Sequence, residues 1–268
     1  MKLRTAVILA AGMGTRLGER GRQLPKGFLQ LGERPIVEES LLRLQRAGIT
    51  RILIVTGHLS HFYAELQQGY GGLVQTVHNP EFADSGSMYS LYLLRDHLDE
   101  DFLLLESDLI YEQRALDTLQ AAEQDNAVLL SGFTDSGDEV FVETRAGLLV
   151  DMSKQRSRLG APASGELVGI SRISRPLFAL MVDYAAAAFR KTLHLDYETD
   201  CLVGVSRDTA IHCPVIGDLL WSEIDDAAHL ARAQETIYPK IRALDVRAEK
   251  SSSRSGGDSL LRRTPDTK

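Results

Sequence analysis

Two glycines and two cations close to the start of the chain offer the clearest chemistry in this sequence. They lie in the segments LAAGMGTRL, which begins at residue 9, and LPKG, which begins at residue 24. Gly12 and Gly14 allow the backbone to turn tightly and to bring its N–H groups close to phosphate oxygens. The Arg16 guanidinium can bind two oxygens at once, whereas Lys26 supplies a compact point charge. This arrangement predicts a loop that binds a polyphosphate.

Two common phosphate-binding patterns do not match this loop. The dinucleotide-binding fingerprint requires a third glycine at position 17, where Leu17 stands. The P-loop requires a lysine framed as GK[ST], and Lys26 is not in that setting. Taken alone, the two glycines are equally well explained as a strand-to-loop turn. Their combination with Arg16 and a downstream Pro-Lys pair is much rarer, and it favours phosphate binding.

Carboxylates at two distant places in the sequence form a second candidate site. Asp108 follows three leucines in LLLESDLIYE, so we expect it at the exit of a buried strand, where open α/β sheets bind their ligands. Asp225 and Asp226 occur in WSEIDD, just before a helix-like stretch. Carboxylate oxygens suit Mg²⁺, although an aspartate in such a place is also a common helix cap. If both segments reach the same sheet edge, two of these groups can share one metal ion.

The surrounding pattern predicts the elements that hold these residues. Residues 5–10 and 51–57 are short, continuous apolar runs, which indicates strands buried on both faces. Between them, residues 35–47 have helical periodicity, with proline at the start and Gly48 at the end. Strand, helix and strand in this order indicate a parallel pair. We therefore predict an α/β fold with a mixed, mostly parallel sheet flanked by helices, and with a β-rich insertion at about 135–175.

Composition limits the class of protein. The chain has 268 residues and a formal net charge of −7, which argues against non-specific nucleic-acid binding. We find no run of 18 apolar residues and no signal-peptide pattern, so we expect no membrane insertion. The two cysteines, Cys201 and Cys213, are too few for a disulfide framework, and we expect buried thiols in a cytoplasmic protein. The oligomeric state is left open, a homodimer included.

The last twenty residues differ from the rest of the chain. Residues 249–268 are rich in Ser, Gly, Arg and Asp and have almost no apolar side chains. Such a segment cannot bury enough surface to order itself. We therefore predict one folded domain at 1–248 and a disordered tail at 249–268.

The glycine-rich loop and its downstream Pro-Lys pair together resemble the signature of the nucleotidyltransferase superfamily. This resemblance implies that the predicted α/β fold is the Rossmann-like fold of that superfamily. The segment NPEFADSGSMYSLYLL, which begins at residue 79, is similar to one in cytidylyltransferases that act on phosphocholine-like substrates. The resemblance implies Arg16 and Lys26 as catalytic cations and Asp108 and Asp225 as ligands of Mg²⁺, with Asp226 the less favoured choice. It implies the following nucleotide-binding residues: Leu9, Ala10, Ala11, Gly12, Gly14, Thr15, Ser85, Gly86, Ser87 and Glu106.

Four later segments narrow the resemblance. SGDEVFVE, GELVGIS, LDYE and IYPKI follow one another between residues 136 and 241. Together with ESDLIYE they resemble the 2-aminoethylphosphonate cytidylyltransferases, from about residue 3 to residue 241. The implied substrates are CTP and a small amino-phosphonate or amino-alcohol phosphate. Asp138, Glu139 and Glu198 are candidates for binding the acceptor ammonium, and Lys154 for binding the phosphonate.

The implied reaction joins CMP from CTP to 2-aminoethylphosphonate and releases pyrophosphate. A phosphonate oxygen would attack the α-phosphorus in line, in a Mg²⁺-dependent step that needs no covalent intermediate. Phosphocholine is the nearest alternative acceptor, and it would favour an aromatic cage. The tyrosines at 89, 92, 111 and 197 and Trp221 are candidates for such a cage. A nucleotide-binding regulatory subunit without activity is an alternative of a different class.

Overall fold

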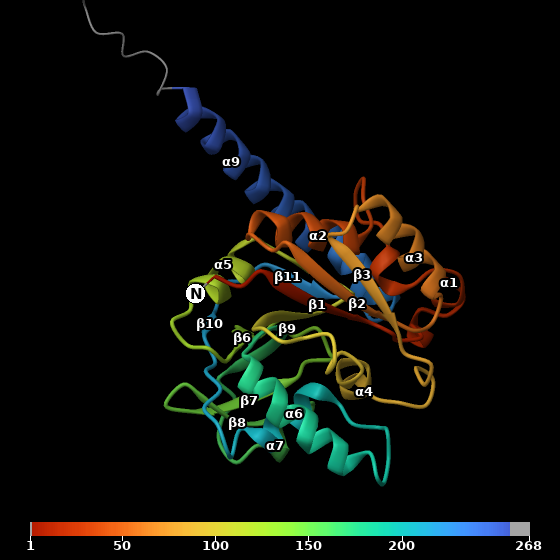
Figure 1. Cartoon of the computed structure of the whole chain (residues 1–268). Coiled ribbons are helices and arrows are strands. Elements are labelled where there is room, and N and C mark those ends of the chain that lie inside the picture. The colour runs from red at the N-terminus through yellow and green to blue at the C-terminus, as the bar shows by residue number, and fades with distance from the viewer. Residues whose placement is uncertain (1, 258–268) are drawn as a thin grey trace, which may run out of the picture.

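The computed structural model describes residues 2–257, and its centre is a nine-stranded mixed sheet (Figure 1). Seven strands follow one another across it in the order β10 (Val215–Ile216), β6 (Ala127–Ser131), β9 (Gly165–Ile173), β4 (Phe102–Glu106), β1 (Thr5–Ala10), β2 (Arg51–Thr56) and β3 (Val74–His78). The strands β7 (Phe141–Arg145) and β8 (Leu148–Ser153) extend the sheet from β9. A separate two-stranded sheet pairs β5 (Leu109–Tyr111) with β11 (Trp221–Glu223).

Helices cover both faces of the sheet. The α-helices are α1 (Glu19–Gln23), α2 (Ile36–Arg46), α3 (Ser60–Gly69), α4 (Ser87–Tyr92), α5 (Arg114–Ala121), α6 (Arg175–Ala188), α7 (Val203–Val205), α8 (Ala227–Arg232) and α9 (Tyr238–Gly257). Short 3₁₀ turns lie at Thr15–Leu17, Lys26–Phe28 and Arg156–Arg158, and π-helical turns at Tyr197–Leu202 and Ala233–Ile237. Figure 1 shows α2, α3 and α5 on one side of the sheet and α4, α6 and α7 on the other.

The central strands are buried on both faces because their side chains alternate between two cores. In β1, Val7 and Leu9 pack into the core that contains α4 and α6. Ala6 and Ile8 point the other way, into the core that contains α2, α3 and α5. This is why β1 and β4 are continuous apolar runs in the sequence, and the predicted mixed sheet with flanking helices is confirmed.

The β-rich insertion lies where the sequence predicted it. Strands β7, β8 and β9 occupy much of 135–175, and β9 runs antiparallel between β4 and β6. It is through β9 that the insertion joins the same sheet as the parallel strands. Its loops therefore stand beside the carboxyl ends of β1 and β4.

Two pairings bring the distant chemical segments to one sheet edge. Parallel β1 and β4 are in register, with Leu9 opposite Glu106, so the glycine-rich loop and Asp108 leave the sheet side by side. Antiparallel β5 and β11 are also in register, with Leu109 opposite Glu223, and the Ile224 N–H donates to the Asp108 carbonyl at 3.1 Å. This second pairing carries Asp225 to Asp108.

Helix α9 begins in the folded body and projects away from it (Figure 1). Its first half is anchored: Ile241 is buried, and the buried Asp245 carboxylate accepts two hydrogen bonds from Arg43 of α2, at 2.8 and 2.7 Å. The helix continues to Gly257, past the predicted domain boundary at residue 248. The rest of the predicted tail, 258–268, lies outside the described residues. Among residues 2–257, no helix combines the length and apolar character needed to cross a membrane.

Candidate active site

A cleft of about 350 Å³ opens at the sheet edge where the two pairings meet. It collects most of the residues predicted from the sequence. Of these it is lined by Leu9, Ala10, Ala11, Gly12, Arg16, Lys26, Ser85, Gly86, Ser87, Glu106, Asp108, Lys154, Glu198 and Asp225. Gly14 and Thr15 are not part of this lining: Gly14 precedes the 3₁₀ turn at Thr15–Leu17, and Thr15 begins it. Asp138 and Glu139 line a smaller adjoining cavity of about 60 Å³, which shares Glu106 and Lys154 with the cleft.

Lys26 lies between the two predicted metal ligands. Its Nζ is 2.7 Å from Asp108 Oδ2 and 2.5 Å from Asp225 Oδ1. Burial alone would lower the pKa of Lys26, but the charges of the two aspartates outweigh burial and raise it above its ordinary value. Lys26 is therefore a permanent cation in the lining of the cleft.

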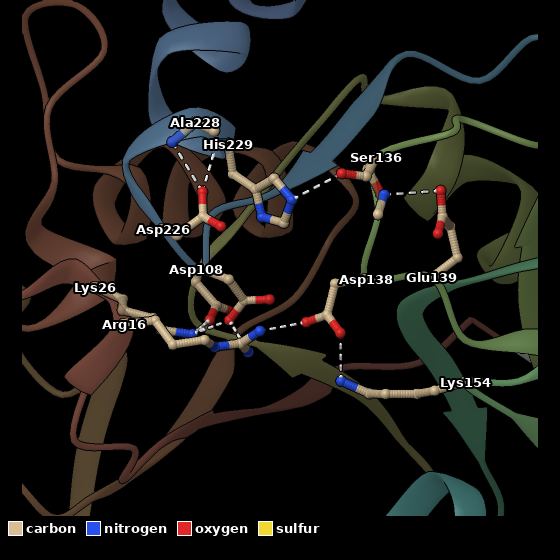
Figure 2. A network of polar contacts seen from close by, with 12 residues as sticks. Arg16, Lys26, Asp108, Ser136, Asp138, Glu139, Lys154, Asp226, Ala228 and His229 are labelled. Atoms are coloured by element: carbon tan, nitrogen blue, oxygen red, sulfur yellow. Dashed lines mark hydrogen bonds and ion pairs between the residues drawn. The ribbon is translucent and has the colours of Figure 1, made fainter.

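Arg16 links this cluster to the opposite wall (Figure 2). One guanidinium nitrogen lies 2.7 Å from Asp225, and the other donates to Asp138 at 2.5 Å. The other oxygen of Asp138 accepts a hydrogen bond from Lys154 Nζ at 2.9 Å. Although burial raises the pKa of Asp138, the hydrogen bonds from Arg16 and Lys154 prevail and lower it below its ordinary value. The sequence predicted an ammonium ligand at this aspartate, whereas the structure pairs it with two cations of the protein.

The two glycines of the loop have different reasons to be glycine. Gly14 has φ of +62°, in the left-handed region, and its carbonyl accepts from the Leu17 N–H to start a 3₁₀ turn. Gly12 has no positive φ, and a Cβ added there meets no atom within 4 Å. The missing side chain at Gly12 leaves open space in the wall of the cleft, so a phosphate group can approach the backbone there.

The segment at Ser85–Ser87 is held in place by contacts with neighbouring segments of the chain. Gly86 lies so close to Leu195 that an added Cβ would stand 2.4 Å from its carbonyl oxygen. The Ser87 hydroxyl accepts from the Tyr197 N–H at 2.9 Å, and the Ser85 hydroxyl accepts from Asn79 at 3.1 Å. These contacts hold the start of α4 at the cleft wall.

Partly buried glutamates make the remaining wall acidic. Burial and the charges of Glu198 and Asp108 raise the pKa of Glu106 to about 8. Burial and the charges of Asp108 and Glu106 raise the pKa of Glu223 to about 10. For Glu198, burial and the neighbouring Asp196 raise the pKa to about 7. Such a concentration of carboxylates favours a ligand that brings positive charge.

The carboxylates at the sheet edge fit a divalent cation. One oxygen from each of Glu106, Asp108 and Glu223 lies within 4.8 Å of the others. Asp225 Oδ2 is buried and has no hydrogen-bond partner among the described residues. An orphaned carboxylate oxygen beside a cluster of oxygen donors is the arrangement that Mg²⁺ or a similar hard cation requires.

The two adjacent aspartates have separate roles. The Asp226 side chain caps α8 by accepting from the N–H groups of Ala228 and His229, both at 2.8 Å (Figure 2). Asp225 faces the cleft and contacts Lys26 and Arg16. This geometry favours Asp225 over Asp226 as a metal ligand.

Glu223 also lines the cleft, although the sequence did not single it out, and so does Tyr197, which the sequence offered only as part of an aromatic cage. The Tyr197 hydroxyl donates to Glu106 at 2.7 Å, and both residues line the cleft. Glu223 is the last residue of β11 and lies two residues before Asp225, and both line the cleft. That spacing was the one available signal for Glu223.

The chain matches the family described as MobA-like NTP transferase domain over residues 6–244. It is 36% identical over 159 residues to CMP-5'-(3-aminopropyl)phosphonate synthase of Streptomyces rubellomurinus, which covers 58% of this chain and 25% of the relative. It is 34% identical over 107 residues to choline-phosphate cytidylyltransferase of Streptococcus pneumoniae, 40% of this chain and 46% of the relative. The chain thus spans less than half the length of these two relatives.

A third relative aligns along most of both chains. It is 2-aminoethylphosphonate cytidylyltransferase of Lancefieldella rimae, 27% identical over 231 residues, 84% of this chain and 90% of the relative. The resemblance expected from the sequence motifs is therefore confirmed.

Solved structures agree on the fold. The inositol-1-phosphate CTP transferase from T. maritima has a TM-score of 0.74 at 18% identity, over 88% of this chain and 98% of that one. The phosphocholine cytidylyltransferase from Streptococcus pneumoniae has a TM-score of 0.69 at 21% identity, over 87% and 99%. With the family match, the fold and the cleft, the chain belongs to the MobA-like NTP transferase family and is a nucleotidyltransferase.

Proposed function

We propose that this enzyme transfers CMP from CTP to 2-aminoethylphosphonate, with release of pyrophosphate. The observation that carries the proposal is one cleft that joins a glycine-rich loop and two cations to a wall of partly buried carboxylates. The cations suit a triphosphate and a phosphonate, and the carboxylates suit a primary ammonium. Three relatives named for cytidylyl transfer to phosphonates or choline phosphate support the same class of substrates.

In the proposed reaction, a phosphonate oxygen forms a bond to the α-phosphorus of CTP while the bond to the pyrophosphate oxygen breaks. The phosphonate is already anionic near neutral pH, so no base has to remove a proton. Lys26 and Arg16 neutralise charge on the phosphates, and the backbone at Gly12 lets them approach closely. Asp108 and Asp225 would hold Mg²⁺, which supplies further charge neutralisation when bound.

For the acceptor, we assign Glu198 and Glu139 to the ammonium and Lys154 to the phosphonate. Glu198 is partly buried at the cleft wall beside Ser87, and Glu223 adds a third carboxylate nearby. Glu139 lies in the adjoining small cavity, where it accepts from the Gly137 N–H at 3.0 Å.

The aromatic residues favour a primary ammonium over choline. A quaternary ammonium is bound best within several aromatic faces. Tyr89 and Tyr92 pack with Phe189 instead, and Tyr111 is buried in the core beneath α2, so none of them lines the cleft. Tyr197 and Trp221 are the candidates that remain near the acceptor walls. Phosphocholine therefore stays the second candidate acceptor.

We also propose that the enzyme acts in the cytoplasm. Cys201 and Cys213 are both buried free thiols, a state typical of a reducing compartment.

The decisive experiment measures pyrophosphate release with CTP and Mg²⁺ in the presence of 2-aminoethylphosphonate, phosphocholine or phosphoethanolamine. We expect the highest kcat/KM with 2-aminoethylphosphonate. A preference for phosphocholine would overturn the acceptor assignment and leave the reaction type intact. Binding of CTP without release of its pyrophosphate in the presence of any of the three acceptors would instead identify a regulatory nucleotide-binding protein.

A further inference from the structure

The proposed function does not explain why the Asp138 carboxylate lies where it does. Its carboxylate bridges two cations that come from different parts of the chain (Figure 2). Arg16, from the glycine-rich loop, donates to one oxygen at 2.5 Å, and Lys154, which follows β8, donates to the other at 2.9 Å. Asp138 itself belongs to the loop between β6 and β7, residues 132–140, which we call the Asp138 loop.

In the proposed reaction, Arg16 and Lys154 both bind anionic groups of the substrates. Arg16 and Lys154 line the cleft, and their side chains are 51% and 56% exposed, so an anion from solution can reach both. A phosphonate or phosphate presents oxygens to such donors in the same way as a carboxylate does. Asp138 therefore accepts the hydrogen bonds that a substrate anion between these two cations would accept.

Both ends of the Asp138 loop are held without the Asp138 side chain. On the β6 side, the Thr134 N–H donates to the buried Glu166 carboxylate at 2.7 Å, and the Ser136 carbonyl accepts from His229 Nε2 at 3.2 Å. On the β7 side, the Val140 carbonyl accepts from the Leu167 N–H at 2.9 Å. The carboxylate can therefore leave its two cations while the loop stays in place.

From these contacts we infer that Asp138 is an internal anion that occupies a substrate-anion subsite between Arg16 and Lys154 in the empty enzyme. It keeps the two cations together when no substrate is present. It leaves them when an anion of the phosphonate or phosphate class binds. The identity of the natural anion, the phosphonate of the acceptor, rests on the proposed function.

If Asp138 only positioned the two cations, removing it would have the opposite effect on anion binding. If Asp138 stayed between Arg16 and Lys154 during binding and only oriented them, its removal would weaken anion binding. If Asp138 competes with the anion, its removal strengthens binding, because the anion no longer has to displace a carboxylate that accepts two charge-assisted hydrogen bonds.

The test measures the affinities of methylphosphonate and pyrophosphate by titration calorimetry at constant ionic strength, for the wild-type chain and Asp138→Asn. We expect at least one of the two anions to bind roughly tenfold more tightly to Asp138→Asn, because the anion no longer has to displace a carboxylate that accepts charge-assisted hydrogen bonds. Asp135→Asn is the matched control. It removes the same charge from the same loop, at a left-handed position (φ +51°) that asparagine tolerates. We expect it to bind as the wild type does.

Unchanged or weaker binding of both anions by Asp138→Asn would overturn the inference, as would equal tightening in Asp135→Asn. Asp138→Ser serves as a second variant if Asp138→Asn does not fold, with thermal unfolding as the check. Neither probe requires CMP transfer. Failure of the proposed function would appear in the pyrophosphate-release assay, and failure of this inference in the calorimetry.

Discussion

Lys26 is held between two carboxylates at the sheet edge, those of Asp108 and Asp225. The sequence predicted its role from the Pro-Lys pair that follows the glycine-rich loop. The two carboxylates that hold it lie 82 and 199 residues away, so their convergence could not be read from local spacing.

We expect Lys26→Ala to reduce kcat for pyrophosphate release by roughly 10²-fold, the usual loss when one positioned electrostatic contact is removed. The assay is the release of pyrophosphate with saturating CTP and acceptor. Lys191→Ala removes the same side chain from an exposed position and is the control, with unchanged kcat expected. Wild-type turnover in Lys26→Ala would remove Lys26 from the catalytic assignment.

Glu198 gives the empty enzyme a pH-dependent stability. Burial and the neighbouring Asp196 raise its pKa from 4.5 to about 7 in the folded state, with Lys154 and Ser87 acting in the opposite direction. Between these two pH values the folded chain keeps a proton that the unfolded chain releases. The contribution of Glu198 to stability therefore falls as the pH rises from about 4.5 to about 7, and it stays low above that range.

Glu198→Gln should remove this loss, because the amide does not ionise. We expect the variant to unfold at a higher temperature than the wild type at pH 8.5, by a few degrees, and at nearly the same temperature at pH 5. Thermal unfolding without ligands, followed by calorimetry at both pH values, measures the difference. A variant that is less stable by the same amount at both pH values would contradict the prediction.

At the scale of elements, predictability followed the length and burial of each strand. The strands β1, β2 and β4 could be predicted because burial on both faces leaves a continuous apolar run. The strands β5 and β11 have three residues each, and nothing local marks them. Their pairing depends on contacts between segments more than a hundred residues apart, yet it is this pairing that places Asp225 in the site.

The contact of α9 with α2 depends on a buried ion pair, Arg43 with Asp245, whose side chains are 5% and 6% exposed. Asp245→Ala would leave the guanidinium buried without its main partner, and we expect it to lower the free energy of unfolding by about 3–5 kcal/mol. Replacing both residues, as Arg43→Met with Asp245→Leu, should recover most of that loss.

Urea unfolding of Asp245→Ala and of the double variant measures this recovery. Arg242→Ala is the control, because Arg242 lies at 3.8 Å from Asp245 and is 43% exposed, so a small change is expected. A double variant as unstable as Asp245→Ala would show that the anchor depends on more than the charge pair.

At the scale of the whole molecule, the cleft is formed by segments from the full length of the folded chain. The glycine-rich loop, the β-rich insertion and the segment at 221–226 each supply one wall. The sequence predicted which segments carry chemistry and the mixed sheet between them. It did not predict that Asp138 and Arg16, 122 residues apart, form an ion pair, because only the packing of the insertion against the first loop brings them together.

We propose residues 1–248 as the catalytic domain, because the anchoring contacts of α9 by Tyr238, Ile241 and Asp245 all precede that boundary. A chain that stops at residue 248 should keep the unfolding temperature and the kcat of the full chain. A chain that stops at residue 237 should unfold at a markedly lower temperature, since it loses all three contacts. Thermal unfolding and pyrophosphate release compare the three chains, and loss of activity in the first truncation would place the boundary later.

The contacts among Lys154, Asp138, Arg16, Asp225, Lys26 and Asp108 form a single row in which positive and negative groups alternate. Three cations and three anions cancel, so the row is electroneutral before any substrate enters. A nucleoside triphosphate finds little surplus positive charge there, and it must bring its own counter-ion. We therefore expect CTP to bind much more tightly with Mg²⁺ than in excess chelator, so that the nucleotide and the metal act as a single ligand for this cleft.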